Sequence, residues 1–236
     1  MKKINSSKHG AQLIQGQNWA QREFGTAKLG DQRLNKRLIT IAKFFTNNPT
    51  VSIPQACGSW KVTKATYRFF DNDRVKEKQI QAPHLSATEK RVANQTTVLA
   101  IQDTTQLDFT HHPSTKGVGL LSDESHFGLF CHPSLLLTPE KVPLGIIDQQ
   151  IWTRSPEDFG KRAQRKKSPI SEKESQKWLT SLKETAKLQE KMPSVHFVNI
   201  GDREADVFDL FVESKNLKQD ILLRAAWDRC VEHPEK

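Results

Sequence analysis

Two aspartates stand directly after short apolar runs, and this position makes them candidates for metal-dependent chemistry. Asp103 follows the run VLAIQ, and Asp202 follows the run VHFVNIG. Both runs have the composition of strands, and ligands of α/β sheets bind at the carboxyl ends of strands. Carboxylate oxygens are the ligands that Mg²⁺ and Mn²⁺ prefer, and such ions support phosphoryl transfer. The alternative is that both aspartates make turns or cap helices, a common use of this residue after a strand.

Five basic residues lie on two predicted helices near the N-terminus and are candidates for DNA contacts. The first helical pattern covers residues 24–47, where Asp31 can cap the helix and apolar residues recur at helical spacing. The second runs from about residue 62 to 70, and its basic residues share one face. The candidates are Arg33, Arg37, Lys61, Lys64 and Arg68. The alternative is an ordinary amphipathic helix with a solvated basic face.

Residues 50–72 predict a short helix, a tight turn and a second helix. Ser52 is a plausible N-cap with Pro54 in the first turn, and Gly58 interrupts the pattern. Tyr67, which lies in the second helix with two phenylalanines, is expected to help pack it. The arrangement is compatible with a helix-turn-helix.

The rest of the sequence predicts an α/β arrangement behind this helical part. Pro83 is expected to break any continuous helix in the polar connector 71–97. A capping box of Ser171 and Glu174 predicts a helix that runs to about Lys191. Strands are expected at 98–103, 104–110, 126–138 and 142–152 as an antiparallel meander, then at 195–202 and 220–227 around a helix at 203–214. The basic stretch 155–175 is interpreted as a solvated loop or a phosphate-contacting arm.

The composition favours an acidic partner and excludes several other classes. The net charge is +9 for 236 residues, and nucleic acid is the commonest partner of so basic a chain. The three cysteines form no CxxC pair, so neither a disulfide framework nor a zinc ribbon is indicated. No apolar stretch approaches the ~20 residues of a membrane span, and the N-terminus lacks a signal-peptide pattern. We therefore expect a cytoplasmic protein with no membrane partner.

Several ordered motifs resemble DDE transposases of the insertion-sequence-four group, which includes the transposon-five transposase. LAIQDTTQLDF resembles the first-aspartate motif of that family, and VNIGDREADVFDLF resembles the second. The segments KESQKWL, LGDQRLNKRL and SIPQACGSWKVTKATYRFF also resemble it. The resemblance extends from about Trp19 to Trp227.

The resemblance implies a ribonuclease-H-like catalytic core preceded by a small all-α DNA-binding domain. Asp103 and Asp202 would be the first two members of the D-D-E triad and would hold Mg²⁺ or Mn²⁺. The family cleaves DNA at transposon ends and joins the freed 3′-hydroxyl to target DNA, working as a homodimer on double-stranded inverted-repeat ends. The implied domains are a flexible start at 1–18, a helical DNA-binding domain at 19–94 and a partial catalytic domain at 95–236. In a bacterial cell such a protein is nucleoid-associated when it is bound to DNA.

One departure from the family pattern affects the expected activity. The family carries its third carboxylate in a Y-x₂-R-x₃-E motif, whereas Tyr67 is the only tyrosine here. Late acids such as Glu232 and Glu235 lie in no helical pattern. The triad is therefore expected to be incomplete in this chain and the dimerisation region to be missing, so the chain would be inactive alone. The alternatives are a non-catalytic DNA-binding repressor and a decayed remnant of a transposase.

Overall fold

The protein is seen here as a computed structural model that describes residues 19–123, 125–155 and 169–228. Two compact units are present, Met1–Ala87 and Thr88–Lys236. We call the described part of the first the helical unit and that of the second the α/β unit. The division between them falls inside helix α5, which spans Glu77–Val92. Among the described residues, no helix is both long enough and apolar enough to cross a membrane.

The helical unit is built from short helices whose ends follow local capping rules. Besides the start of α5 it contains α1 (Trp19–Phe24), α2 (Gln32–Asn47), α3 (Ile53–Cys57) and α4 (Trp60–Phe70). Asp31 caps α2 by accepting the backbone N–H of Arg33, as expected from the sequence. Ser52 and Gln55 form a capping box on α3, and Gly58 ends it at a φ of 68°. The predicted helix, turn and helix are therefore present, although α4 begins at Trp60 rather than near residue 62.

An apolar cluster holds these helices together. Its fully buried members come from α2, α4 and the segment before α2, and they include Leu29, Ile41 and Phe69. Ile80 of α5 packs against the same cluster. Burying such side chains contributes roughly 1.5–3 kcal/mol each, which exceeds the small helix propensity of the sequence.

The prediction that Pro83 breaks the helix was wrong, because α5 runs through it. A proline removes one backbone hydrogen bond and costs about 3 kcal/mol inside a helix. In α5, Ile80 is anchored in the cluster of the helical unit, and Val92 is fully buried in the α/β unit. Packing on either side of the proline therefore holds the helix where local propensity alone would end it.

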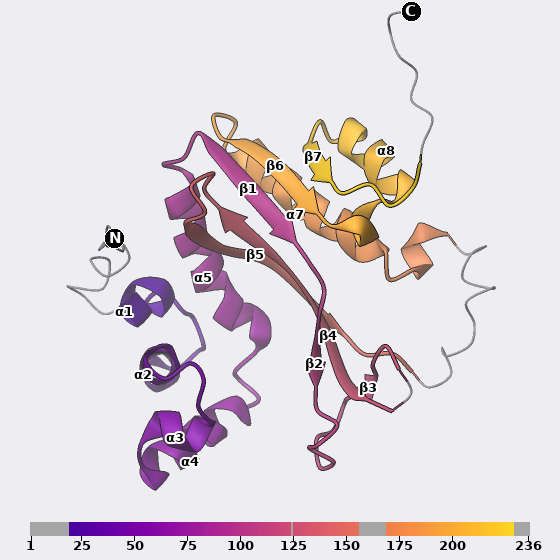
Figure 1. Ribbon diagram of the computed structural model, residues 1–236. Coiled ribbons are helices and arrows are strands. Elements are labelled where there is room, and N and C mark those ends of the chain that lie inside the picture. Colours follow the sequence, from indigo (N-terminus) through magenta and orange to yellow (C-terminus); the bar gives the residue numbers. More distant parts are fainter. Residues whose placement is uncertain (1–18, 124, 156–168, 229–236) are drawn as a thin grey trace, which may run out of the picture. The chain divides into compact units, whose positions relative to one another are not determined.

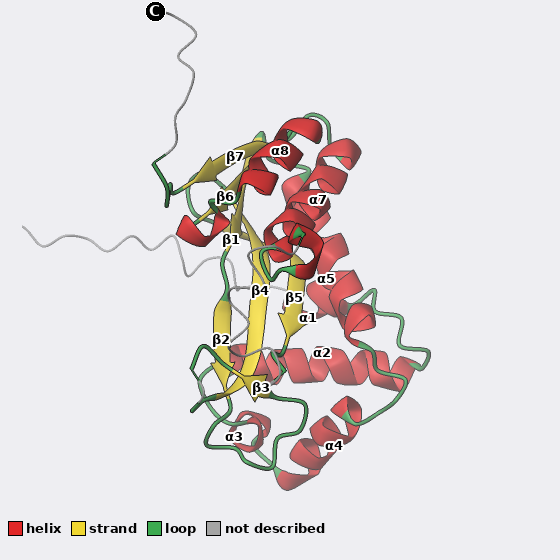
Figure 2. Cartoon of the chain, turned by 90° about the vertical axis from the view of Figure 1, so that its right-hand side faces the viewer, coloured by secondary structure: helices red, strands yellow, loops and turns green. Residues whose placement is uncertain are grey.

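The α/β unit is organised around a mixed sheet of seven strands among the described residues (Figures 1 and 2). The strands are β1 (Thr97–Gln102), β2 (Thr105–Asp108), β3 (Gly119–Leu120), β4 (Phe127–Leu137), β5 (Pro143–Trp152), β6 (His196–Gly201) and β7 (Asp220–Leu223). The main strands lie in the order β5-β4-β1-β6-β7. β4 runs antiparallel to β1 and β5, whereas β1, β6 and β7 run parallel. This strand order and direction define a ribonuclease-H-like sheet, as the resemblance implied.

The helices of this unit bury one face of the sheet. They are η3 (Ile170–Glu172), α7 (Gln176–Lys191), η4 (Arg203–Ala205) and α8 (Phe208–Asn216). Every second residue of β1 and β6 is buried, and the apolar ones, Val98, Ala100 and Phe197, pack with Leu188 of α7. Figure 2 shows α7 lying along the sheet. The alternate residues of β1 and β6 face the less covered side, and this is the side to which the strand ends deliver Asp103 and Asp202.

Three details of the sequence interpretation need correction in the α/β unit. β1 and β2 do not pair as a hairpin; both lie along β4, so β2 continues the line of β1. Ser171 does not cap α7, because the helix begins at Gln176 after a turn of 3₁₀ helix, and Glu174 is engaged by Arg154 instead. The predicted helix 203–214 is divided into η4 and α8.

Candidate functional sites: a basic groove and an acidic strand edge

All five basic residues predicted to contact DNA line one groove of the helical unit. The groove holds roughly 450 Å³ and lies between α2 and α4. Its lining residues are Arg33, Leu34, Arg37, Lys61, Lys64, Ala65, Arg68, Phe69 and Asn72. The two helices therefore bring together cations that are far apart in the sequence. We call the set Arg33, Arg37, Lys61, Lys64 and Arg68 the basic groove.

One of these cations is held by the helix cap itself. The Arg33 guanidinium bonds both carboxylate oxygens of Asp31, with Nη2 2.9 Å from Oδ2. The hydrogen bonds from Arg33 lower the pKa of Asp31 below its ordinary value. The Arg33 side chain is 90% exposed, so this surface pair contributes little energy while it orients the charge.

Two aromatic side chains of α4 are exposed to solvent, which the sequence did not indicate. Trp60, the first residue of α4, is 74% exposed. Tyr67, which we expected to pack inside, is 42% exposed, while Phe69 takes the buried position. Helical periodicity did not distinguish these residues because apolar and aromatic types fill both faces of α4.

The strand register brings the two aspartates together at one edge of the sheet. β1 and β6 are parallel neighbours in which Ile101 pairs with Ile200. Residues directly paired in this way share a face of the sheet. Continued past both strand ends, the same register places Asp103 beside Asp202, on the less covered face. Neighbouring strands are ~4.8 Å apart, a spacing at which two carboxylates can share one cation.

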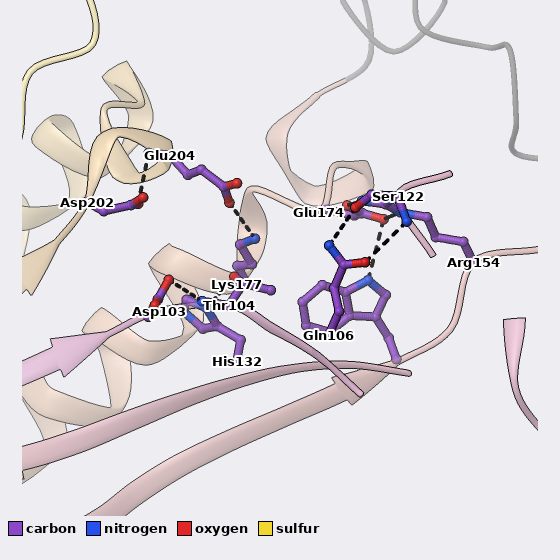
Figure 3. Close-up of polar contacts among 11 residues, drawn as sticks. Asp103, Thr104, Gln106, Ser122, His132, Arg154, Glu174, Lys177, Asp202 and Glu204 are labelled. Carbon is purple, nitrogen blue, oxygen red and sulfur yellow. Dashed lines mark hydrogen bonds and ion pairs between the residues drawn. The ribbon is translucent and has the colours of Figure 1, made fainter. Parts of the chain in front are cut away.

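Each carboxylate is oriented by a hydrogen bond from a backbone N–H one or two residues further along the chain, and each remains exposed to solvent. Asp103 Oδ1 accepts the backbone N–H of Thr104 at 2.7 Å, and Asp202 Oδ1 accepts that of Glu204 at 2.9 Å (Figure 3). Among the described residues, no hydrogen bond reaches either Oδ2. The Oδ2 atoms of both aspartates are therefore hard oxygen ligands that could bind a cation without the loss of a hydrogen bond.

A row of polar side chains crosses the covered face of the sheet beneath these strand ends. We call it the polar band. Its members are Gln102, Thr104, His132, Ser134, Asp148, Gln150 and Asn199. On β5, Asp148 accepts the Ser181 hydroxyl of α7 at 2.8 Å, and Gln150 donates to the Lys177 carbonyl at 3.0 Å. The band therefore ties α7 to the sheet by hydrogen bonds as well as by apolar contact.

His132 occupies the centre of the polar band and is fully buried. Its Nδ1 lies 2.9 Å from Thr104 Oγ1, and its ring meets Trp178 edge-on at 4.6 Å. Burial lowers the pKa of His132 to about 4, and the charge of Lys177 adds to this shift. The Asp103 backbone and the Asp202 charge act in the opposite direction without reversing it. The imidazole is therefore neutral at pH 7.

Lys177 is a cation near the acidic edge that the sequence did not single out for a role. Its side chain is 10% exposed, and Nζ lies 3.3 Å from Glu204 Oε2 and 5.6 Å from the rings of Trp152 and Trp178 (Figure 3). Asp206, by contrast, is turned inward and accepts the backbone N–H groups of Ala226 and Trp227. Of the two acids that follow Asp202 in the segment 202–206, Glu204 therefore faces Lys177 and Asp206 anchors the chain after β7.

A second, structural ion pair lies just before the N-terminus of α7. Arg154 bonds Glu174 through two nitrogens, and its guanidinium stacks 4.1 Å from the Phe130 ring centroid. Burial raises the pKa of Glu174, but the hydrogen bonds and charge of Arg154 outweigh it, so the net shift is downward. Figure 3 shows this pair apart from Asp103 and Asp202. The pair fixes the segment before α7 rather than adding to the acidic edge.

Within the described ranges, no group of three or more His, Cys, Asp or Glu side chains is placed to hold a metal ion. The acidic edge consists of two carboxylates. The basic stretch at 161–167 and the late acids Glu232 and Glu235 lie outside the described residues. Trp178 is 1% exposed and belongs to the core.

Comparison with known families identifies the N-terminal region. Residues 16–75 match the family described as "Transposase DNA-binding". This region of the chain is therefore similar to a transposase DNA-binding domain. The matched segment contains every member of the basic groove.

Two solved transposase structures are also similar to the chain at a distance. One is a Mos1 transposase paired-end complex with a left transposon end, at 11% identity and a TM-score of 0.29. The other is a pre-cleavage Mos1 transpososome, at 10% identity and a TM-score of 0.26. Each match covers 79% of this chain and 58% of the Mos1 chain, so the protein spans less than two thirds of their length.

Proposed function

We propose that this protein is a transposase of the DDE type, or a part of one, that acts on the DNA ends of a mobile element. In this proposal the helical unit binds double-stranded inverted-repeat ends. The α/β unit supplies two carboxylates for metal-dependent cleavage and strand transfer. The motifs around Asp103 and Asp202 favour the insertion-sequence-four group.

One observation carries this proposal. A chain with a transposase DNA-binding domain also has a ribonuclease-H-like sheet in which Asp103 and Asp202 follow paired parallel strands in register. Aspartates that only made turns would have no reason to meet on one face. Their meeting is what a shared divalent cation requires.

The residues at the acidic edge fit Mg²⁺ or Mn²⁺. Both carboxylates are exposed, both have an oxygen outside their turn bond, and both are hard donors. Asp103 and Asp202 would hold the ion. When bound, such an ion supplies Lewis-acid stabilisation for the attack of water or a 3′-hydroxyl on a phosphodiester. A third carboxylate and the contacts of a homodimer would come from outside the described residues.

Other residues of this chain would bind the DNA, orient the two aspartates and place a positive charge near them. The basic groove neutralises DNA phosphates and fixes the position of the duplex. The turns at Asp103 and Asp202 orient their carboxylates toward the less covered face of the sheet. Lys177, held between two tryptophans, places a fixed positive charge beside an edge that a polyanion must approach.

Metal binding by the purified protein tests the catalytic half of the proposal. Mn²⁺ would be titrated and the free ion followed by electron paramagnetic resonance. Asp103→Asn and Asp202→Asn keep an oxygen for the turn bond but remove the charge, so each is expected to weaken binding at least tenfold. Asp108→Asn is the matched control, because Asp108 is also exposed and accepts a turn N–H from Thr110. Equal affinity in all four proteins would contradict a site at the acidic edge.

Selection from a randomised duplex library tests the DNA-binding half. We expect the protein to enrich one sequence, and we expect its affinity for that sequence to fall steeply with salt. Recovery of unenriched DNA would contradict recognition of defined ends.

A non-catalytic role is the second candidate, and the size of the acidic edge favours it. Two carboxylates, rather than three, are brought together in the described residues. The chain would then occupy transposon ends and exclude an active transposase. Sequence-selective DNA binding with no Mg²⁺- or Mn²⁺-dependent nicking of the selected duplex would support this role. Nicking that Asp103→Asn abolishes would exclude it.

A further inference from the structure

We propose that His132 is a positioning residue for Asp103, acting through Thr104, so that a buried imidazole on β4 sets the direction of the first carboxylate. This inference rests on the proposed function for its consequence, metal binding. Its structural part concerns only the residues of the α/β unit.

The strand register makes Thr104 and His132 cross-strand partners. Gln102 pairs with Ser134 before the break between β1 and β2, and Thr105 pairs with Cys131 after it. The register is unchanged across the break, so Asp103 lies opposite Pro133 and Thr104 lies opposite His132. The Thr104–His132 hydrogen bond therefore spans the two strands where β1 and β2 are interrupted.

Pro133 explains why a side-chain bond is needed at this point. A proline has no backbone N–H, so β4 offers no donor at the position opposite Asp103. The ladder is broken over Asp103 and Thr104, although they keep the register. The bond from Thr104 Oγ1 to His132 Nδ1 holds the chain to β4 across this gap.

Thr104 in turn sets the Asp103 carboxylate. Its backbone N–H donates to Asp103 Oδ1 at 2.7 Å. If residue 104 rotates, this donor moves and the Asp103 side chain loses the contact that selects its rotamer. One peptide thus links the buried hydroxyl contact to the exposed carboxylate (Figure 3).

His132 is suited to this role because it cannot move. It is fully buried, and Trp178, itself 1% exposed, stands edge-on against the ring. Its Nε2 has no hydrogen-bond partner among the described residues, and its side chain is held at the Asp103–Thr104 segment, by Thr104 Oγ1 and by the Asp103 backbone. A buried polar group of this kind is costly. Its place on β4, beside the end of the strand that leads to Asp103, is accounted for if it orients that strand end.

Hydrogen exchange of one amide tests the structural part. The backbone amide of residue 104 would be followed by NMR in metal-free protein. Thr104→Val keeps the shape but removes the hydroxyl, and we expect the amide to exchange about tenfold faster. Thr104→Ser restores the hydroxyl and is expected to restore protection. Thr105→Val is the matched control, because it makes the same change one residue further along, on the other face of the sheet.

A second pair of variants tests the Thr104–His132 hydrogen bond by changing the histidine. His132→Asn places a polar atom near the position of Nδ1, whereas His132→Leu does not, and both leave a similar volume. We expect residue 104 to stay protected in His132→Asn and to lose protection in His132→Leu. Loss of the fold in both would leave the threonine series to decide.

Mn²⁺ affinity measured on the same proteins distinguishes the positioning role of His132 from the proposed metal-binding function. We expect Thr104→Val to weaken Mn²⁺ binding about tenfold and Thr104→Ser to restore it. Unchanged exchange of amide 104 in Thr104→Val would overturn the positioning role, whatever the metal does. Faster exchange with no Asp103-dependent Mn²⁺ binding would leave the positioning role standing and overturn the proposed function instead.

Discussion

The candidate sites of the two units differ in charge and in the elements that hold them: the basic groove lies on helices, and the acidic edge lies at strand ends. The basic groove consists of long side chains on two helices, and its members are mostly solvent-exposed. The acidic edge consists of two short side chains on strand ends, above a buried polar band that is bonded to α7. A groove that recognises a flexible polyanion tolerates mobile cations, whereas a cation site demands fixed oxygens. We therefore expect core changes to damage the acidic edge and surface changes to damage the groove.

The largest expected effect is loss of the core anchor beneath the acidic edge. Trp178→Ala should destabilise the α/β unit by about 3–5 kcal/mol, because a fully buried indole is replaced by a cavity. Hydrogen–deuterium exchange should rise in peptides from β1 and β6. Trp60→Ala is the control in the helical unit and should leave exchange unchanged, since Trp60 is 74% exposed. Equal protection of the backbone amides from exchange in both variants would contradict the expectation that core changes damage the acidic edge.

The next effect concerns DNA affinity. A triple variant with Lys61, Lys64 and Arg68 changed to glutamine should lose affinity for duplex DNA on the order of a hundredfold at 0.1 M salt, because three phosphate contacts disappear. The slope of log K against log salt should fall by about 2.7. Fluorescence anisotropy over a salt series measures both.

A charge-matched control sharpens this test. Lys36, Lys43 and Lys78 are exposed residues of the helical unit that do not line the groove. Their replacement by glutamine makes the same change in net charge. If that variant loses as much affinity as the groove variant, the protein binds DNA through overall charge and not through the groove.

Acidification should weaken the α/β unit through His132. The unfolded imidazole has a pKa near 6.5, whereas the folded one has a pKa of about 4, so between these values protons bind the unfolded state preferentially. Stability is full above pH 6.5 and is lost as the pH falls toward 4, with about 2 kcal/mol lost by pH 5. Urea unfolding in EDTA at pH 7 and pH 5 measures this loss. His132→Asn should reduce it, and an identical loss in that variant would contradict the assignment to His132.

The smallest effect is expected at the ion pair before α7. Glu174→Gln removes the charge that Arg154 engages with two nitrogens, and the cost should be about 1 kcal/mol because the pair is partly solvated. The effect should appear in urea unfolding of the α/β unit but not in Mn²⁺ affinity. Glu172→Gln, an exposed neighbour, is the control. A larger loss of Mn²⁺ affinity than of stability would place the pair in the acidic edge after all.

Local patterns predicted the features that depend on neighbouring residues. Asp31 and Ser52 cap their helices as expected, and Gly58 takes the positive φ that a tight turn requires. The apolar runs before Asp103 and Asp202 are strands, as expected from their composition. The assignment of these residues to metal and DNA stays a prediction.

Features that depend on tertiary packing could not be predicted in the same way. Pro83 remains inside a helix because both sides of that helix are anchored by burial, which local propensity does not report. His132 was one of several histidines, and its contact with Thr104 follows from a cross-strand register that no periodicity encodes. Lys177 acquires its place only when α7 packs against the sheet.

The parallel pairing of β1 with β6 also has a kinetic consequence. A hairpin can form as soon as its turn is made, but these two strands meet only after β2–β5 and α7 have been traversed. Such non-local pairing requires the closure of a long loop and slows folding. The acidic edge should therefore be among the last parts of the protein to assemble during synthesis. The helical unit, whose contacts are closer in sequence, should fold while the later strands are still being made.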